Sequence, residues 1–68
     1  MPRYHLELLT RDNGEEGPEG PEVLTKHRIT AVSEVVARRT TIERVLQAGG
    51  LVSRFTFVQV IPPPKGKV

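Results

Sequence analysis

The chain has 68 residues, with ten Lys and Arg, eight Asp and Glu, and a formal net charge of +2. This length supports one domain at most, which buries about 60% of its unfolded surface. The absence of cysteine excludes disulfides, zinc ribbons and thiol catalysis. No apolar run approaches the ~20 residues of a membrane span, and no apolar signal follows the N-terminus. We therefore expect a cytoplasmic protein with no membrane contact.

The small net charge conceals a division along the chain. Residues 11–22 carry one arginine and five carboxylates, which gives −4, whereas residues 23–68 carry eight basic and two acidic side chains, which gives +6. An acidic segment beside a basic body is more informative than the overall value.

The first predicted element is a half-buried strand over residues 4–9. Apolar and polar side chains alternate there, so Tyr4, Leu6 and Leu8 share one face. After it, residues 11–22 are rich in Gly and Pro and contain no aliphatic side chain. Because their carboxylates repel one another and nothing in them can be buried, we expect a flexible acidic loop whose Asn-Gly dipeptide makes a turn.

A second strand and a helix are predicted to follow. Residues 23–32 favour an extended conformation, with the odd-numbered side chains buried. The helix is expected to be capped by Ser33 or Thr30 and to end at the two glycines after Ala48. A second short helix that begins at Thr40 is the alternative, because Thr40 and Glu43 fit a capping box.

One half of the helical wheel is apolar and is expected to face the core. Arg39 falls within this half, where its stem either packs while the guanidinium reaches solvent, or serves as an interface arginine. The apolar residues of this half are Val32, Val35, Val36, Ile42, Val45 and Leu46.

The last strand is predicted over residues 51–61, followed by a Pro-rich basic tail over residues 62–68. The order β-β-α-β indicates a single α+β domain over residues 1–61. We expect a three-stranded, mainly antiparallel sheet with the first strand in the middle and the helix on one face.

One helix leaves one sheet face uncovered, and the last strand is apolar on both faces. One of these faces carries Leu51, Phe55, Phe57 and Ile61, and the other carries Val52, Val58 and Val60. We expect the three valines, together with Arg39, to form a protein interface, through which the chain binds a partner or a second copy. The alternative is that strand twist and the acidic loop cover these valines.

Catalysis and metal binding have little support in the sequence. The histidines are His5 and His27, and the one aspartate, Asp12, lies in the predicted loop, so no triad is held together. A metal site from His5, Glu7 and His27 depends on the hairpin register, which we expect to place the two histidines on opposite faces. No enzyme activity, cofactor, metal or small-molecule substrate is inferred.

The leading hypothesis is a small non-catalytic binding module. It is a protein-binding accessory or inhibitor-like regulator that uses the uncovered sheet face and the basic helix. Its small size suits a phage or mobile-element protein. The alternative is a DNA- or RNA-binding regulator with an arginine-rich patch. That patch consists of Lys26, Arg28, Arg38, Arg39, Arg44 and Arg54.

Overall fold

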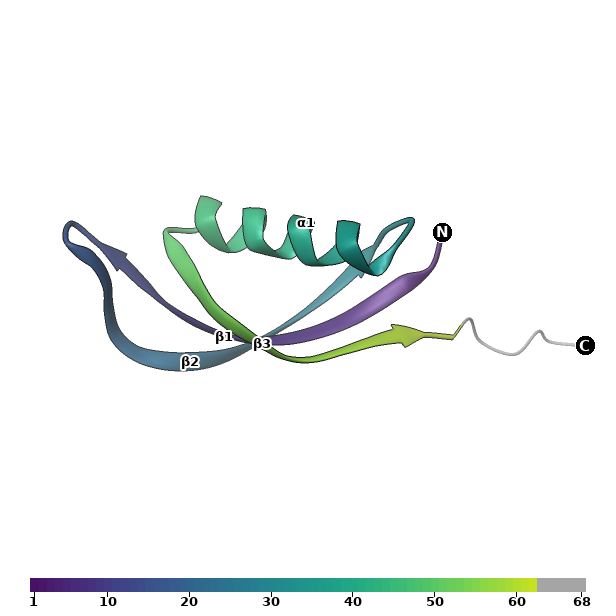
Figure 1. The fold of residues 1–68 in the computed structure, drawn as a ribbon, viewed down its shortest axis with the longest axis horizontal. Helices are drawn as coiled ribbons and strands as arrows, with labels where there is room; N and C mark the ends of the chain where they lie inside the picture. Colours follow the sequence, from purple (N-terminus) through teal and green to yellow (C-terminus); the bar gives the residue numbers. More distant parts are fainter. Residues whose placement is uncertain (63–68) are drawn as a thin grey trace, which may run out of the picture.

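The computed structural model describes residues 1–62, which form three strands and one helix (Figure 1). The elements are β1 (Arg3–Gly14), β2 (Gly17–Thr30), α1 (Glu34–Gln47) and β3 (Gly50–Ile61). The sheet order is β2-β1-β3, and β1 runs antiparallel to both neighbours. This confirms the predicted α+β fold and strand order. Apart from Pro62, the predicted basic tail lies outside the described residues.

The acidic segment 11–22 is paired strand, so the prediction of a loop was wrong. β1 continues to Gly14 and β2 begins at Gly17, which leaves Glu15 and Glu16 as the turn. Gly17 takes a φ of +114°, a conformation that glycine adopts without strain, so the chain reverses beyond the Asn-Gly dipeptide. Backbone ladder bonds organise this segment although its apolar side chains, Pro18 and Pro21, are both exposed. We call residues 11–22 the acidic arm.

The core lies between α1 and the concave side of the curved sheet (Figure 1). The register places Ile29 of β2 opposite Tyr4 of β1, so both face the helix, as the sequence predicted. Leu8 is also fully buried. The core cluster contains Tyr4, Leu6, Ile29, Ala31 and Ala37, with Val36, Phe55 and Val58 packed against it.

An extra residue in β3 changes which side chains share a face. Phe55 pairs with Leu8 and Phe57 pairs with Glu7, so Thr56 is left between them. The Thr56 hydroxyl donates a hydrogen bond to the Glu7 carbonyl oxygen at 3.1 Å, which holds this bulge against β1. Because one added residue reverses the alternation, Phe55 and Phe57 point to opposite faces. The prediction that both lie on one buried face was wrong.

The same irregularity moves the valines that were assigned to the uncovered face. Val58 and Val60 pair with Leu6 and Tyr4, the β1 residues that face the helix. Val58 packs against the core, whereas Val60 lies at its margin and is 52% exposed. Val52 lies beyond a second irregularity and is half-buried. The predicted valine patch on the open face is therefore not present.

Helix α1 is continuous, and its ends match the sequence signals. The Ser33 side chain accepts a hydrogen bond from the Val36 amide at 3.3 Å, which identifies Ser33 as the N-cap. At the other end, Gly49 takes a φ of +85° and its amide donates to the Leu46 carbonyl at 3.0 Å. The alternative of a second helix starting at Thr40 is excluded.

Candidate protein-binding surface

Helix α1 packs on the sheet through small side chains. Its buried residues are Ala37, Thr41 and Val45, which lie four residues apart along one face. Thr41 is fully buried, and its hydroxyl donates to the Ala37 carbonyl at 2.8 Å, so its polar atom is satisfied within the helix. Small residues let the helix lie close to the sheet, whereas larger aliphatic side chains would hold it away.

Half of the six residues that were predicted to face the core are therefore exposed instead. Within α1, residues 35, 39, 42 and 46 follow intervals of four, three and four residues, the spacing of one helix face in a coiled coil. Val32 precedes the N-cap at the start of this face, and Ile42 is half-buried. Val32 is 66% exposed, Val35 is 64% exposed and Leu46 is 49% exposed. We call this surface the outer stripe; it consists of Val32, Val35, Arg39, Ile42 and Leu46.

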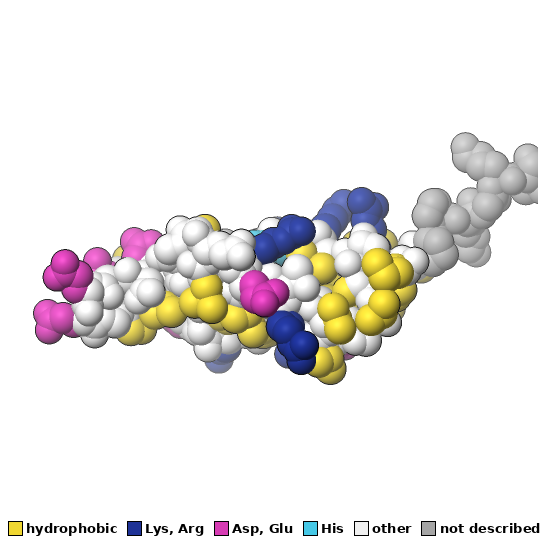
Figure 2. All heavy atoms as spheres, turned by 90° about the horizontal axis from the view of Figure 1, so that it is seen from above, with side chains coloured by type: hydrophobic (Ala, Val, Ile, Leu, Met, Phe, Trp, Pro, Cys, Tyr) yellow, Lys and Arg dark blue, Asp and Glu magenta, His cyan; other side chains and the backbone are white. Residues whose placement is uncertain are grey.

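The outer stripe is open to solvent in the single chain. Figure 2, viewed from the helix side, shows apolar side chains at the surface with basic and acidic groups beside them. Val36 and Val45 are the two valines of the predicted apolar half that do contact the interior. The helix thus exposes Val35 and Leu46 to water while it buries the small residues Ala37 and Thr41 against the sheet. A surface helix usually buries its larger aliphatic side chains.

Arg39 is the cation within this stripe, and its neighbours on the helix are engaged elsewhere. Arg38 forms an ion pair with Glu34, with 2.9 Å between Nη2 and Oε2, and its guanidinium lies 5.1 Å from the centre of the Phe55 ring. Arg44 is close enough to His27 to affect its titration. Arg39 is exposed, which leaves its charge available at the helix surface.

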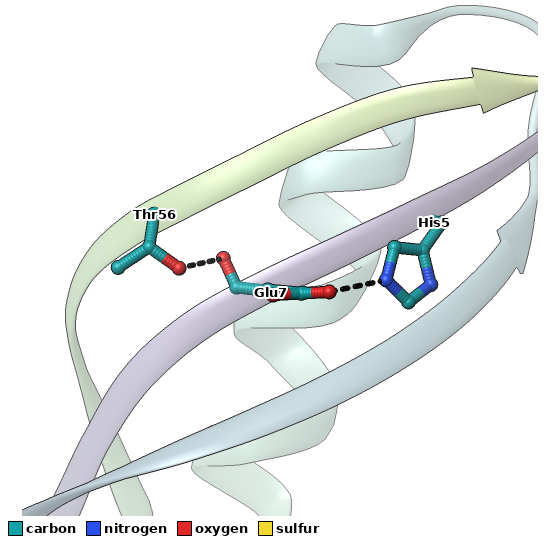
Figure 3. Close-up of polar contacts among 3 residues, drawn as sticks. All are labelled: His5, Glu7 and Thr56. Atoms are coloured by element: carbon teal, nitrogen blue, oxygen red, sulfur yellow. Dashed lines mark hydrogen bonds and ion pairs between the residues drawn. The ribbon is translucent and has the colours of Figure 1, made fainter.

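The opposite face of the sheet is uncovered, as predicted, but it is mixed in character. His5 and Glu7 of β1 lie on it, with 2.7 Å between Nε2 and Oε2 (Figure 3). The Phe57 ring meets the His5 ring edge-on, with 6.1 Å between centroids. Leu9 pairs with Leu24, which adds a small apolar pair. Several charged groups separate the apolar ones on this face, whereas the outer stripe contains a single charged residue, Arg39.

The structure divides the six basic residues of the predicted nucleic-acid patch between two sides. Lys26 and Arg28 of β2 pair with Glu7 and His5, which places them on the open sheet face. Arg54 pairs with a β1 residue of that same face, Leu9. Arg38, Arg39 and Arg44 belong to α1 on the other side. The six side chains therefore do not form one patch.

His27 lies on the helix side of β2, where it pairs with Leu6, so the two histidines are on opposite faces as the register argument predicted. It borders a groove of about 260 Å³ with Thr25, Asp12 and Arg44. Partial burial, and secondarily the positive charge of Arg44, hold the pKa of His27 below its usual 6.5. Within residues 1–62, no group of three potential metal ligands is assembled.

The sequence contained a signal for the outer stripe that the prediction did not use. The spacing of Val35, Ile42 and Leu46 identifies one face, and the small residues Ala37 and Thr41 identify the other. Reading both faces together indicates that either one can pack inward, and the structure selects the small one.

Comparison of the chain with protein-family models, with curated proteins and with solved structures gives no match. Within residues 1–62, no helix has the length and apolar character that a bilayer crossing requires.

Proposed function

We propose that this chain is a non-catalytic protein-binding accessory module that acts through the outer stripe of α1. The observation that carries the proposal is that Val35 and Leu46 face solvent while α1 makes its own core contact through Ala37 and Thr41. Aliphatic side chains aligned on the exposed face of a helix, here with Arg39 among them, form the kind of surface that a partner's apolar groove or helix covers.

The charge layout favours a protein over a nucleic acid as the partner. The basic residues are split between two faces, and Arg38 is already engaged with Glu34 and Phe55. The acidic arm adds a concentration of negative charge at one end of the molecule, which repels phosphates (Figure 2). Phe55 packs against the core, which removes one of the few aromatic rings on which a base would stack.

Affinity purification from the native host, with the native chain and two matched variants immobilised in turn, tests this proposal. Leu46 and Leu24 are both 49% exposed, but Leu46 lies on the outer stripe and Leu24 on the open sheet face. We expect the native chain and Leu24→Glu to recover the same protein from the native host, and Leu46→Glu to lose it. The recovered protein is then purified and its binding to all three chains is measured by calorimetry.

Two results would contradict the proposal. One is recovery of nucleic acid as the dominant material, released by salt, with little difference between the variants. The other is a protein whose purified form binds Leu46→Glu as tightly as the native chain.

A further inference from the structure

We propose that the occupant of the outer stripe is a second copy of this chain, bound with the two α1 helices antiparallel about a two-fold axis. This proposal rests on the proposed function and names its partner. It places one helix against its own copy, so a single surface serves as both halves of the interface.

Full overlap of two antiparallel helices brings the apolar positions together. Val35 is the second residue of α1 (Glu34–Gln47), and Leu46 is the second from its end. Residues equally distant from opposite ends face each other, so Val35 of one chain meets Leu46 of the other. By the same rule Arg39, the sixth residue, meets Ile42, the sixth from the end. Aliphatic contacts between Val35 and Leu46 thus lie near both ends of the helix pair, and contacts between Arg39 and Ile42 lie between them.

The charges on the helix select the antiparallel orientation. In a parallel pair, identical residues face one another, so Arg39 would lie against its own copy in a partly dehydrated interface. In the antiparallel pair, Arg39 lies beside Ile42 and Glu43 of the second chain, and symmetry repeats this contact. Ion pairs among residues 1–62 are limited to His5–Glu7 and Glu34–Arg38, so neither Arg39 nor Glu43 has a competing ion pair there. The outer stripe together with Glu43 beside it is therefore self-complementary in charge.

The acidic arm gives an independent reason for the same orientation. The Asn13 amide donates to the Gly49 carbonyl at 3.1 Å, which ties the arm to the C-terminal end of α1. Figure 1 shows the hairpin tip projecting beyond that end. Parallel helices would bring two arms of charge −4 side by side, whereas antiparallel helices send them to opposite ends of the dimer.

The interface is short, so the association should depend on concentration. A helix of 14 residues is ~21 Å long, and one such pair buries less than a standard protein interface. We expect a dissociation constant of about 10–100 μM, which sedimentation equilibrium of the full chain resolves between about 10 μM and 1 mM. The native chain should approach twice its monomer mass at the upper concentration.

Charge reversal tests the contact between Arg39 and Glu43 directly. Both residues are exposed in the single chain, so their substitution should leave the circular dichroism spectrum unchanged. Arg39→Glu and Glu43→Arg should each weaken the dimer about threefold to tenfold, because each places like charges together. The double variant should recover the native dissociation constant to within about threefold. A double variant that dimerises more weakly than either single variant would overturn this pairing.

Disulfide crosslinking tests the orientation, and the chain is suited to it because it contains no cysteine. A mixture of Val35→Cys chains and isotope-labelled Leu46→Cys chains should yield mainly the mixed disulfide under mild oxidation. Predominance of disulfides between two Val35→Cys chains would show a parallel pair and overturn the antiparallel arrangement.

Leu46→Glu should raise the dissociation constant at least about tenfold, whereas Leu24→Glu, equally exposed, should leave it unchanged. A dimer that Leu24→Glu disrupts and Leu46→Glu does not would place the interface on the open sheet face and overturn the proposal. A native chain that stays monomeric at 1 mM (roughly tenfold above the weakest constant expected) would also overturn it. In that event, a different protein whose binding depends on Leu46 would leave the proposed function standing.

Discussion

His27 is half-buried beside the C-terminal part of α1, and its titration links one residue to the stability of the whole chain. Burial and the charge of Arg44 lower its pKa in the folded protein below 6.5, so the folded chain takes up a proton at lower pH than the unfolded chain. The free energy of unfolding should therefore fall as pH drops below about 6.5 and continue to fall until the lowered pKa is reached. Above about pH 6.5, His27 is neutral in both states and its full contribution to the free energy of unfolding is present.

Two measurements check this prediction. The ring signals of His27 in an NMR titration should show a midpoint below 6.5, and Arg44→Gln should raise that midpoint only in part, because burial is the larger cause. Urea unfolding at about pH 7.5 and pH 5.5 should show a pH dependence that His27→Gln reduces. His5→Gln, on the other sheet face, is the control, and this variant should keep the part of the pH dependence that comes from His27. An unaltered pH dependence in His27→Gln would contradict the assignment.

The packing of α1 on the sheet sets a size limit on its inner face. Ala37 is fully buried against the core, so Ala37→Leu should destabilise the fold by about 1–3 kcal/mol through overpacking. Val35→Leu adds one methylene group on the outer stripe, where space is open, and should change the unfolding free energy by less than about 0.5 kcal/mol. Denaturant unfolding at a low protein concentration, where the chain is monomeric, compares the two. Equal destabilisation by both variants would show that the helix faces were assigned wrongly.

At the level of elements, local signals in the sequence predicted most of the fold. The alternation of Tyr4, Leu6 and Leu8 identified the central strand, and Ser33 and Gly49 fixed the ends of the helix. These signals are local because a cap or a strand face depends on a few neighbouring residues. The sheet order then followed from connection rules, and the structure confirms it.

The errors concern features that depend on distant contacts. The predicted inner face of α1 was wrong in part. Val45 is buried as predicted, but a helical wheel also favours burial of Val35 and Leu46, whereas packing on this sheet selected Ala37 and Thr41. The faces of β3 were wrong because a bulge at Thr56 is one residue with no distinctive composition. As a consequence, Val58 was assigned to the candidate interface and Leu46 to the core, and the structure reverses both.

The whole molecule is elongated, and its core occupies only part of its length. It measures 55 × 18 × 15 Å along its principal axes. The buried cluster is built from residues 4–8 of β1 and their neighbours, whereas the acidic arm extends β1 and β2 beyond the helix (Figure 1). Stability should therefore vary along the long axis, since local opening is least costly where few apolar contacts are broken.

Amide hydrogen exchange of the monomer measures this gradient. The amides of Leu6 and Leu8 should be among the slowest to exchange, because their exposure requires the core to open, whereas arm amides should exchange through local fraying of the ladder. Like charges on the arm promote that fraying, so Glu15→Gln with Glu19→Gln should slow exchange in the arm and leave Leu6 unchanged. Raising the salt concentration should reduce the difference in amide exchange rate between the native arm and the doubly substituted arm, because salt screens the repulsion between the carboxylates. Arm amides as protected as those of Leu6 would show that the molecule opens as one cooperative unit and would contradict the gradient.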